Sequence, residues 1–233
     1  MDKPRKKLEV LGYVFILSVA ILAQYLARTD LQYFEGVFTR EDSFVEWMTV
    51  LGFFLGISVC IYRAIILAPF RGLKFRLGLI FWACLLFFGL GEEISWAQRI
   101  IGFETPHWFL VHNTQGEFNF HNLRFGDFKV NRFIFGTVLG VIVVLYFLVL
   151  PLLYRKVESV KKFANEWAIF VPRIYHIVAY VTLAALAKTI PSGKKGEILE
   201  FGGVWIFTLL IFEPLNREFF SRKLKPSDNL PPS

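Results

Sequence analysis

Cysteine and charge are both scarce in this chain. Of its 233 residues only two are cysteines, Cys60 and Cys84, and both lie inside apolar stretches. A disulfide framework is therefore excluded, and the thiols are expected to pack as small apolar side chains. Charged residues make up 19% of the chain and hydrophobic residues 55%, whereas soluble proteins are about 45–50% apolar. The composition excludes an ordinary soluble domain and indicates an integral membrane protein.

Six apolar stretches approach the length of about 20 residues that a helix needs to cross a bilayer. They lie near residues 10–27, 44–70, 75–95, 133–154, 167–187 and 198–215. The third and the sixth are marginal because each carries carboxylates at one end. The first resembles a signal peptide, but it is long for one and lacks a convincing cleavage site, so we interpret it as a retained anchor.

The fold class expected from these stretches is all-α, a polytopic transmembrane helix bundle of about six spans. The bundle forms a single domain over residues 1–222, with a structured loop on the outer side after the third span. Residues 223–233 are polar and rich in proline, which predicts a disordered cytoplasmic tail.

The net charge of +7 follows this topology. If the N-terminus is cytoplasmic, most of the basic residues fall on the cytoplasmic side, as the positive-inside rule requires. Both termini are then cytoplasmic, and no nucleic-acid partner is implied.

The loop at residues 96–132 is longer than a simple connection needs, and long ordered loops are usually functional. Its many aromatic residues, among them Trp96, Trp108 and Phe118, argue against disorder. Pro106 is placed to start a short helix over the apolar patch that follows it. We therefore expect a folded loop with aromatic side chains at the depth of the lipid headgroups.

Glu92 and Glu93 stand at the carboxyl end of the third span, where the helix dipole disfavours negative charge. Carboxylates at the edge of a membrane are costly and frequently functional. Glu41, Asp42 and Glu197 lie at the starts of their helices, where an acidic residue is an ordinary partner of the dipole. The pair Glu92 and Glu93 is therefore the predicted centre of a polar site.

The loop also supplies groups that bind metals. Glu117 and His121 are four residues apart, a spacing that brings them to one face of a helix or of an extended strand. With Glu93 they would provide the oxygen and nitrogen ligands that suit a divalent metal ion. No His-Glu-x-x-His motif is present, and interfacial histidines often only form hydrogen bonds, so both interpretations stay open.

A dense set of amides and one guanidinium accompanies these groups. Arg99 is placed either to neutralise Glu92 or to bind a phosphate with both arms of its guanidinium. The candidate catalytic residues are Glu92, Glu93, Arg99 and His121. The candidate residues for binding substrate or supporting the site are Glu46, Gln98, Asn113, Gln115 and Asn122.

Three segments of the chain, REDSFVEWMTVLGFFLG, GLGEEISWAQRIIGFETP and NTQGEFNFHNL, resemble a group of small bacterial multi-pass membrane proteins. That group shares GEEISWxQRI and NxQGExNxHN signatures, and the resemblance covers about a third of the chain. It implies a bacterial inner-membrane setting and no particular mechanism. Glycine is frequent in the group at the positions of Ser43 and Ala97.

Two functions remain open from the sequence. The first is an enzyme at the outer membrane face that acts on a lipid or lipid-linked substrate, with Glu92 or Glu93 as base or metal ligand and Arg99 as headgroup clamp. The second is a non-enzymatic component, either an ion-binding or transport protein or a subunit that docks on a protein partner in the membrane.

Overall fold

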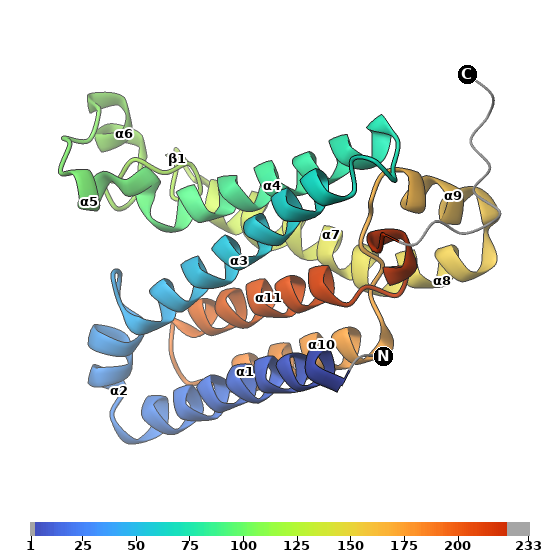
Figure 1. Cartoon of the computed structure of the whole chain (residues 1–233). Helices are drawn as coiled ribbons and strands as arrows, with labels where there is room; N and C mark the ends of the chain where they lie inside the picture. The colour runs from blue at the N-terminus through green and yellow to red at the C-terminus, as the bar shows by residue number, and fades with distance from the viewer. Residues whose placement is uncertain (1–2, 223–233) are drawn as a thin grey trace.

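The structure is a computed structural model that describes residues 3–222, with side chains described from residue 7 onward. The described chain is mostly helical (Figure 1). The α-helices are α1 (Lys3–Thr29), α2 (Leu31–Tyr33), α3 (Phe44–Ile66), α4 (Leu73–Glu93), α5 (Gln98–Ile101), α6 (His107–His112), α7 (Leu139–Val144), α8 (Leu150–Lys156), α9 (Glu158–Glu166), α10 (Ile174–Lys188) and α11 (Lys195–Phe212).

Short irregular elements join or extend these helices. The π-helical segments are Phe34–Phe38, Asn131–Val138 and Leu145–Val149, and the 3₁₀ segments are Ser95–Ala97 and Arg217–Phe220. Strands β1 (Arg124–Phe125) and β2 (Phe128–Lys129) pair antiparallel as a small hairpin in the loop.

Within residues 3–222, four helical runs are long and apolar enough to cross a membrane. They are Lys7–Thr29, Phe44–Ile66, Leu73–Glu93 and Asn131–Lys156. Apolar side chains on their outer faces are exposed, as lipid-facing residues are. These helices make the chain a membrane-embedded protein with at least four candidate spans.

The other two predicted spans fit less well. The apolar part of the fifth is the short helix α10, which begins at Ile174 and not near 167. Ala168 adopts a left-handed backbone with φ 51°, and Pro172 follows it, so the chain between α9 and α10 cannot continue as a helix. The sixth corresponds to α11, which ends at Phe212, just before Pro214.

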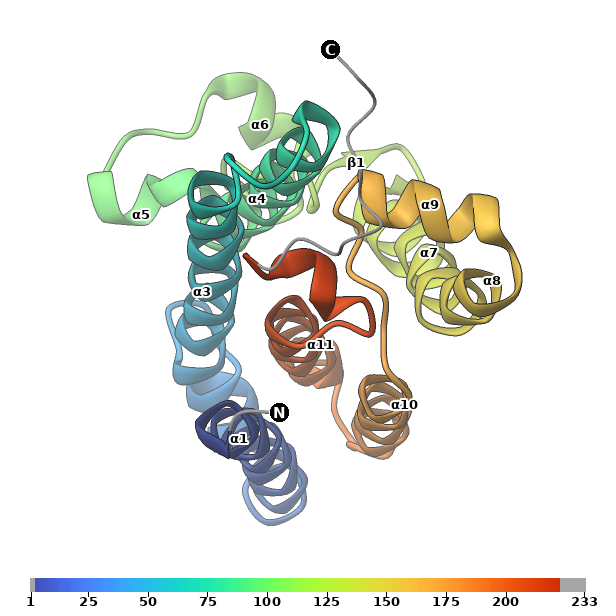
Figure 2. The same ribbon diagram turned by 45° about the vertical axis from the view of Figure 1, so that its right-hand side comes forward.

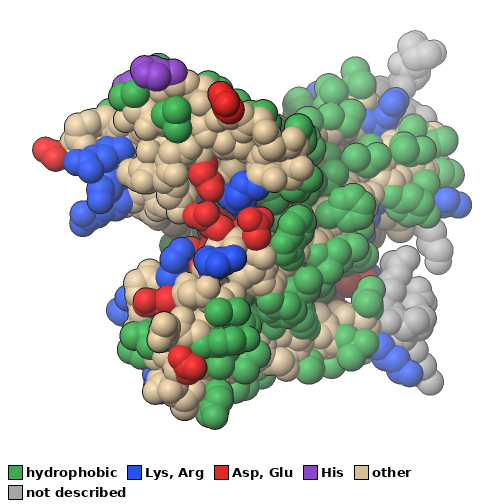
Figure 3. All heavy atoms as spheres, turned by 90° about the vertical axis from the view of Figure 1, so that its left-hand side faces the viewer, with side chains coloured by type: hydrophobic (Ala, Val, Ile, Leu, Met, Phe, Trp, Pro, Cys, Tyr) green, Lys and Arg blue, Asp and Glu red, His purple; other side chains and the backbone are tan. Residues whose placement is uncertain are grey.

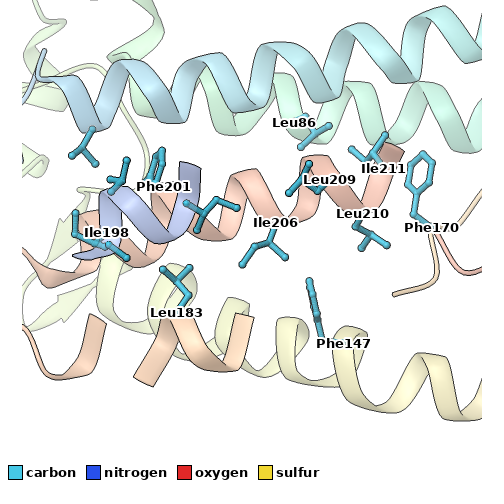
Figure 4. Packing of buried hydrophobic residues seen from close by; sticks show 14 of the residues in the cluster. Leu86, Phe147, Phe170, Leu183, Ile198, Phe201, Ile206, Leu209, Leu210 and Ile211 are labelled. Carbon is cyan, nitrogen blue, oxygen red and sulfur yellow. The ribbon is translucent and has the colours of Figure 1, made fainter. Parts of the chain in front are cut away.

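The core lies around α11. This helix packs against α1, α3 and α10, and it occupies the middle of the bundle in Figure 2. Its buried residues Phe201, Ile206 and Leu210 meet Leu183 of α10 and other apolar side chains in one cluster (Figure 4). Although α11 is enclosed by other helices along its length, Lys195 and Glu200 near its start are exposed, whereas Glu213 just after its end is buried.

A close contact between α3 and α11 fixes this arrangement. Gly52 and Gly56 form a GxxxG pattern on α3, which lets helix backbones approach closely. A side chain at Gly52 would meet Val204 at 3.0 Å. The hydroxyl of Thr208 donates a hydrogen bond of 2.9 Å to the carbonyl oxygen of Gly52, and the indole of Trp205 donates one of 2.9 Å to Met48. α11 is thereby held beside α3, and their ends at the site lie close together.

The segment between α4 and the fourth run is folded. It contains α5, α6 and the β1–β2 hairpin, and it projects beyond the end of α4 (Figure 1). The short helix after Pro106 is α6, with Pro106 as the residue that precedes its first turn. The tail predicted for residues 223–233 lies outside the described residues.

Candidate functional site

The site is built on an abrupt end of α4. The helix stops at Glu93, earlier than the predicted end near residue 95. Ser95, Trp96 and Ala97 then have φ angles of 47°, 54° and 62°, a left-handed region that α-helices of L-residues avoid. Glu92 and Arg99 would share one face only if the helix continued to Ile100, and the left-handed residues between them prevent this.

Trp96 folds back over the end of α4 after this turn. A side chain at Gly91 would meet the Trp96 ring at 2.9 Å, so the ring packs against a bare stretch of backbone. Its indole nitrogen donates a hydrogen bond of 2.7 Å to Oε1 of Glu92. The turn thus delivers a donor to the first of the two adjacent glutamates.

Glu92 holds the loop in place. Glu92 is buried, with 4% of its surface exposed. Its Oε2 accepts hydrogen bonds of 2.8 Å from the backbone amides of Phe120 and His121. The Nδ1 atom of His121 lies 3.3 Å from the same oxygen. Carboxylates that accept several N–H donors are stabilised in the charged form. Glu92 is therefore anchored on all sides and faces the loop.

His121 joins Glu92 to the amides of the loop. Its Nε2 lies 3.0 Å from the side-chain amide nitrogen of Asn122, which can only donate. Nε2 is therefore the unprotonated nitrogen in this arrangement, and Nδ1 carries the hydrogen that points to Glu92. The same Asn122 amide also donates to Gln115, whose own amide donates a hydrogen bond of 2.8 Å to Glu41.

Arg99 binds three carboxylates, and Glu92 is not among them. Its guanidinium nitrogens lie 3.0 Å from Asp42, 2.7 Å from Glu46 and 2.8 Å from Glu117. Glu46 also accepts a hydrogen bond of 2.9 Å from the backbone amide of Asp42. Arg99 thus connects the start of α3 to the loop, and it neutralises these residues instead of Glu92.

The pKa of Arg99 reflects this setting. Burial alone lowers the pKa of the guanidinium, but the carboxylates of Glu117, Glu46 and Asp42 outweigh burial and raise it above its usual value. For Glu41, which lies just before α3, burial and the nearby Glu117 carboxylate raise the pKa, while Arg99 opposes the rise. The acidic residues around Arg99 therefore compete for its one positive charge.

The predicted amides stabilise the loop. Asn113 donates hydrogen bonds of 2.9 and 2.8 Å to the backbone and side-chain oxygens of Asn119. Asn119 in turn donates one of 2.9 Å to Ser95 in the turn after α4. The side-chain oxygen of Gln98 accepts a bond of 2.7 Å from the backbone amide of Phe118. These amides shape the loop and satisfy its buried backbone.

A polar cavity of about 140 Å³ lies between the loop and the ends of α3, α4 and α11. Figure 3 looks onto this end of the molecule, where acidic and basic side chains gather at the centre. The cavity is lined by Thr39, Arg40, Glu41, Glu46, Glu93, Arg99, Gln115, Glu117, Asn119, His121, Asn122, Asn131, Lys194, Glu197 and Glu200.

Glu93 faces this cavity and not the loop. Its carboxyl lies within hydrogen-bonding reach of Glu200 and also interacts electrostatically with Glu197 and Glu46. Among the residues that the structure describes, no Lys or Arg forms an ion pair with Glu93 or Glu200. Lys194 lies 3.9 Å from Glu197. Glu93 is thus surrounded by other acids at the end of three helices.

The structure brings most of the candidate residues to one place. Seven of them line the cavity, namely Glu46, Glu93, Arg99, Gln115, Glu117, His121 and Asn122. Glu92, Gln98 and Asn113 lie behind it and hold the loop. Glu197 and Glu200 also line the cavity. The sequence places both at the start of the sixth predicted span, where an acidic residue is an ordinary partner of the helix dipole, and it does not single out Arg40, Lys194 or Asn131. The clustering of acids at several predicted helix ends was the available signal for Glu197 and Glu200.

The predicted metal ligands Glu93, Glu117 and His121 all line the cavity but face different partners. Glu117 is bound to Arg99 and also accepts hydrogen bonds from Ser95 and from Asn119. Within residues 3–222, no group of three or more His, Cys, Asp or Glu side chains is arranged to hold a metal ion. The geometry gives no support to this ligand set.

Comparison with known proteins adds no relative. No protein-family model, curated protein or solved structure matches the chain. The cavity itself is therefore the best indication of what the protein binds.

Proposed function

We propose that this membrane protein binds a small cation in the cavity at the ends of α3, α4 and α11. The observation that supports the proposal is the position of Glu93, whose carboxyl meets Glu200 without a basic partner among the described residues. Two carboxylates this close repel each other unless a proton or another cation lies between them. A bound cation would remove that repulsion.

The charge around the cavity favours the same ligand. Six glutamates line it, against three basic residues, Arg40, Arg99 and Lys194. Arg99 is already engaged by three carboxylates. The remaining basic groups do not balance the acids, so the cavity attracts positive charge.

The size of the cavity limits the ligand. At about 140 Å³ it is smaller than the range of about 300–1,000 Å³ that is usual for sites of drug-sized molecules. It has room for a few water molecules, an inorganic cation or a small ammonium group, but not for a whole lipid. We propose that the site opens to the outer face of a bacterial inner membrane, as the distribution of basic residues and the resemblance suggest.

A second candidate function is acid-base catalysis on a lipid-linked substrate. It is favoured by the pair of Glu92 and His121, in which a buried carboxylate lies 3.3 Å from Nδ1 while the imidazole lines the cavity. A carboxylate in this position orients an imidazole for proton transfer through its other nitrogen. Here Glu92 positions the ring and His121 is the group that would move the proton.

Calorimetric titration of the purified full-length protein tests the first proposal. The probes are sodium, potassium, magnesium, calcium, manganese, zinc and ethanolammonium chlorides, each in two buffers of different ionisation enthalpy. We expect one of them to bind with release of protons, since the cation replaces protons held between carboxylates. Glu93→Gln and Glu200→Gln should weaken this binding at least tenfold.

Glu104→Gln is the matched control, because Glu104 is an exposed carboxylate of the same loop and does not line the cavity. It should bind as wild type does. If no cation of the panel binds wild type, or if Glu104→Gln loses as much affinity as Glu93→Gln, cation binding at this cavity is refuted. The enzyme candidate would then be tested by His121→Asn in a lipid-conversion assay.

A further inference from the structure

A second hollow lies in the loop, away from the acidic cavity. It measures about 650 Å³ and is lined by Val111, His112, Asn113, Thr114, Arg124, Phe125 and Gly126. None of these residues lines the acidic cavity. Its size falls in the range of about 300–1,000 Å³ that is usual for ligand sites.

Arg124 gives this hollow a positive charge. It begins the β1–β2 hairpin, and its Nε donates a hydrogen bond of 2.7 Å to the carbonyl oxygen of Gly126. Gly126 has φ 59°, a left-handed turn that favours glycine. Neither terminal nitrogen of Arg124 has a hydrogen-bond or ion-pair partner within residues 7–222. The hairpin therefore fixes the side chain while leaving the two amino groups that best bind phosphate oxygens.

This is the role that the sequence suggested for Arg99. Arg99 cannot take it, because Asp42, Glu46 and Glu117 already occupy its guanidinium. The loop thus separates two arginines by function. Arg99 connects the loop to the bundle through three carboxylates. Arg124 lines the hollow, whose lining contains no carboxylate among the described residues.

Val111, His112 and Phe125 give the hollow an apolar and aromatic part, beside the polar Asn113 and Thr114. The ring of His112 stacks on Trp108 with centroids 4.6 Å apart, and it lies 5.7 Å from the ring of Phe125. Val111 is 63% exposed and Phe125 is 46% exposed. Exposed aromatic and aliphatic side chains beside a basic group are typical of protein surfaces at the depth of lipid headgroups.

We propose that this hollow binds the phosphodiester headgroup of an anionic phospholipid. Arg124 contacts the phosphate, and Val111, Trp108 and Phe125 contact the upper part of an acyl chain. A free phosphate ion would use the guanidinium but leave the apolar side uncovered, whereas a phospholipid satisfies both. The site is independent of the cation cavity and of the function proposed for it.

Native mass spectrometry of the full-length protein in detergent tests this proposal. The probes are short-chain phosphatidylglycerol, phosphatidylcholine of the same chain length, and inorganic phosphate. We expect phosphatidylglycerol to bind more tightly than phosphatidylcholine, and millimolar inorganic phosphate not to displace it. Arg124→Gln should lower the affinity for phosphatidylglycerol about tenfold, because a charged hydrogen-bonded contact is lost. Val111→Ser should lower the affinity for both lipids to a similar extent, and by less than Arg124→Gln lowers the affinity for phosphatidylglycerol.

Arg132→Gln is the control, since Arg132 is an exposed arginine close to the hairpin that does not line the hollow. It should keep the affinity of wild type, and all variants should melt at the wild-type temperature without lipid. Three results would overturn the proposal: equal binding of the two lipids by wild type, equal losses in Arg124→Gln and Arg132→Gln, or displacement of the lipid by inorganic phosphate. The second result would indicate general attraction to basic charge, and the third a site for the free ion.

Discussion

Glu92 and Glu93 are neighbours on α4, yet their carboxyl groups serve different parts of the protein. Glu92 accepts hydrogen bonds from the indole of Trp96 and from the backbone amides of Phe120 and His121. Glu93 faces the acids of the cavity, where it interacts electrostatically with Glu200, Glu197 and Glu46. One glutamate therefore holds the structure together, and the other adds negative charge to the site.

Opposite changes in stability should follow from replacing these two residues by glutamine. Glu92→Gln loses the charged acceptor of several N–H donors and should cost about 2 kcal/mol, a fall in melting temperature of about 5 °C. At a pH where the carboxyls of Glu93 and Glu200 are both ionised, Glu93→Gln removes their repulsion and should raise the melting temperature when no cation is added. Thermal unfolding followed by tryptophan fluorescence measures both. A stabilising Glu92→Gln would contradict its anchoring role.

Replacement of Arg99 should release the loop. Arg99→Gln leaves Asp42, Glu46 and Glu117 without their shared partner, and trypsin should then cut the loop at Arg124 sooner than in wild type. Arg99→Lys should give an intermediate rate, because an ammonium group cannot contact three carboxylates with a planar fork. Cleavage is followed by gel and mass spectrometry.

Lys195→Gln serves as the control for Arg99, since Lys195 is an exposed cation at the start of α11. Trypsin should cut the loop of the Lys195→Gln variant at the wild-type rate. Equal cleavage of Arg99→Gln and wild type would show that the three ion pairs do not hold the loop.

Ala97→Gly should stabilise the protein. Ala97 has φ 62°, and a left-handed conformation costs a residue with a side chain about 1–2 kcal/mol. Glycine avoids that cost, so we expect a rise in melting temperature of about 2–4 °C. The matched control is Ala185→Gly on the exposed face of α10, which should lose about 0.5–1 kcal/mol because glycine is unfavourable inside a helix. A loss of stability at both positions would contradict the left-handed turn.

The acidic residue Glu41 should make stability depend on pH. Burial and the nearby Glu117 raise the pKa of Glu41, so the folded state binds its proton more tightly than the unfolded state does. The stabilisation is complete below the unfolded pKa and is lost as pH rises through the folded pKa.

Melting temperatures of wild type and Glu41→Gln between about pH 4 and pH 7 test this linkage. We expect the melting temperature of Glu41→Gln to rise relative to that of wild type as pH increases, because glutamine has no proton to lose. Glu104→Gln should follow the wild-type curve. A difference between Glu41→Gln and wild type that stays constant with pH would refute the shift.

Much of the bundle was predictable because its signal is local. The stretches around α3 and α4 are apolar over a length that spans a bilayer, and the observed helices begin within two residues of the expected starts at 44 and 75. The apolar part of the fifth span is harder to delimit, since the left-handed Ala168 is invisible in a hydropathy pattern.

The sequence predicts most of the residues that form the candidate site, but not which of them contact one another. Helix ends that carry acids gather at one surface once the topology is drawn, which located Glu46 and Glu93. The partners of Arg99 depend on three consecutive left-handed residues after α4. The residue types Ser95 and Trp96 do not predict such a turn, because non-glycine residues rarely adopt a positive φ. The pairing therefore required the three-dimensional path of the chain.

The separation of Glu92 from Glu93 is finally a matter of angle. Successive residues of an α-helix point about 100° apart, and α4 presents its last two side chains to the loop and to α11 at that angle. Inserting one residue within α4 would rotate its end by the same amount, so that Glu92 would point toward the cavity and Gly91 toward the loop. The chemistry of the cavity thus depends on the register of a helix whose buried contacts begin as far away as Phe75.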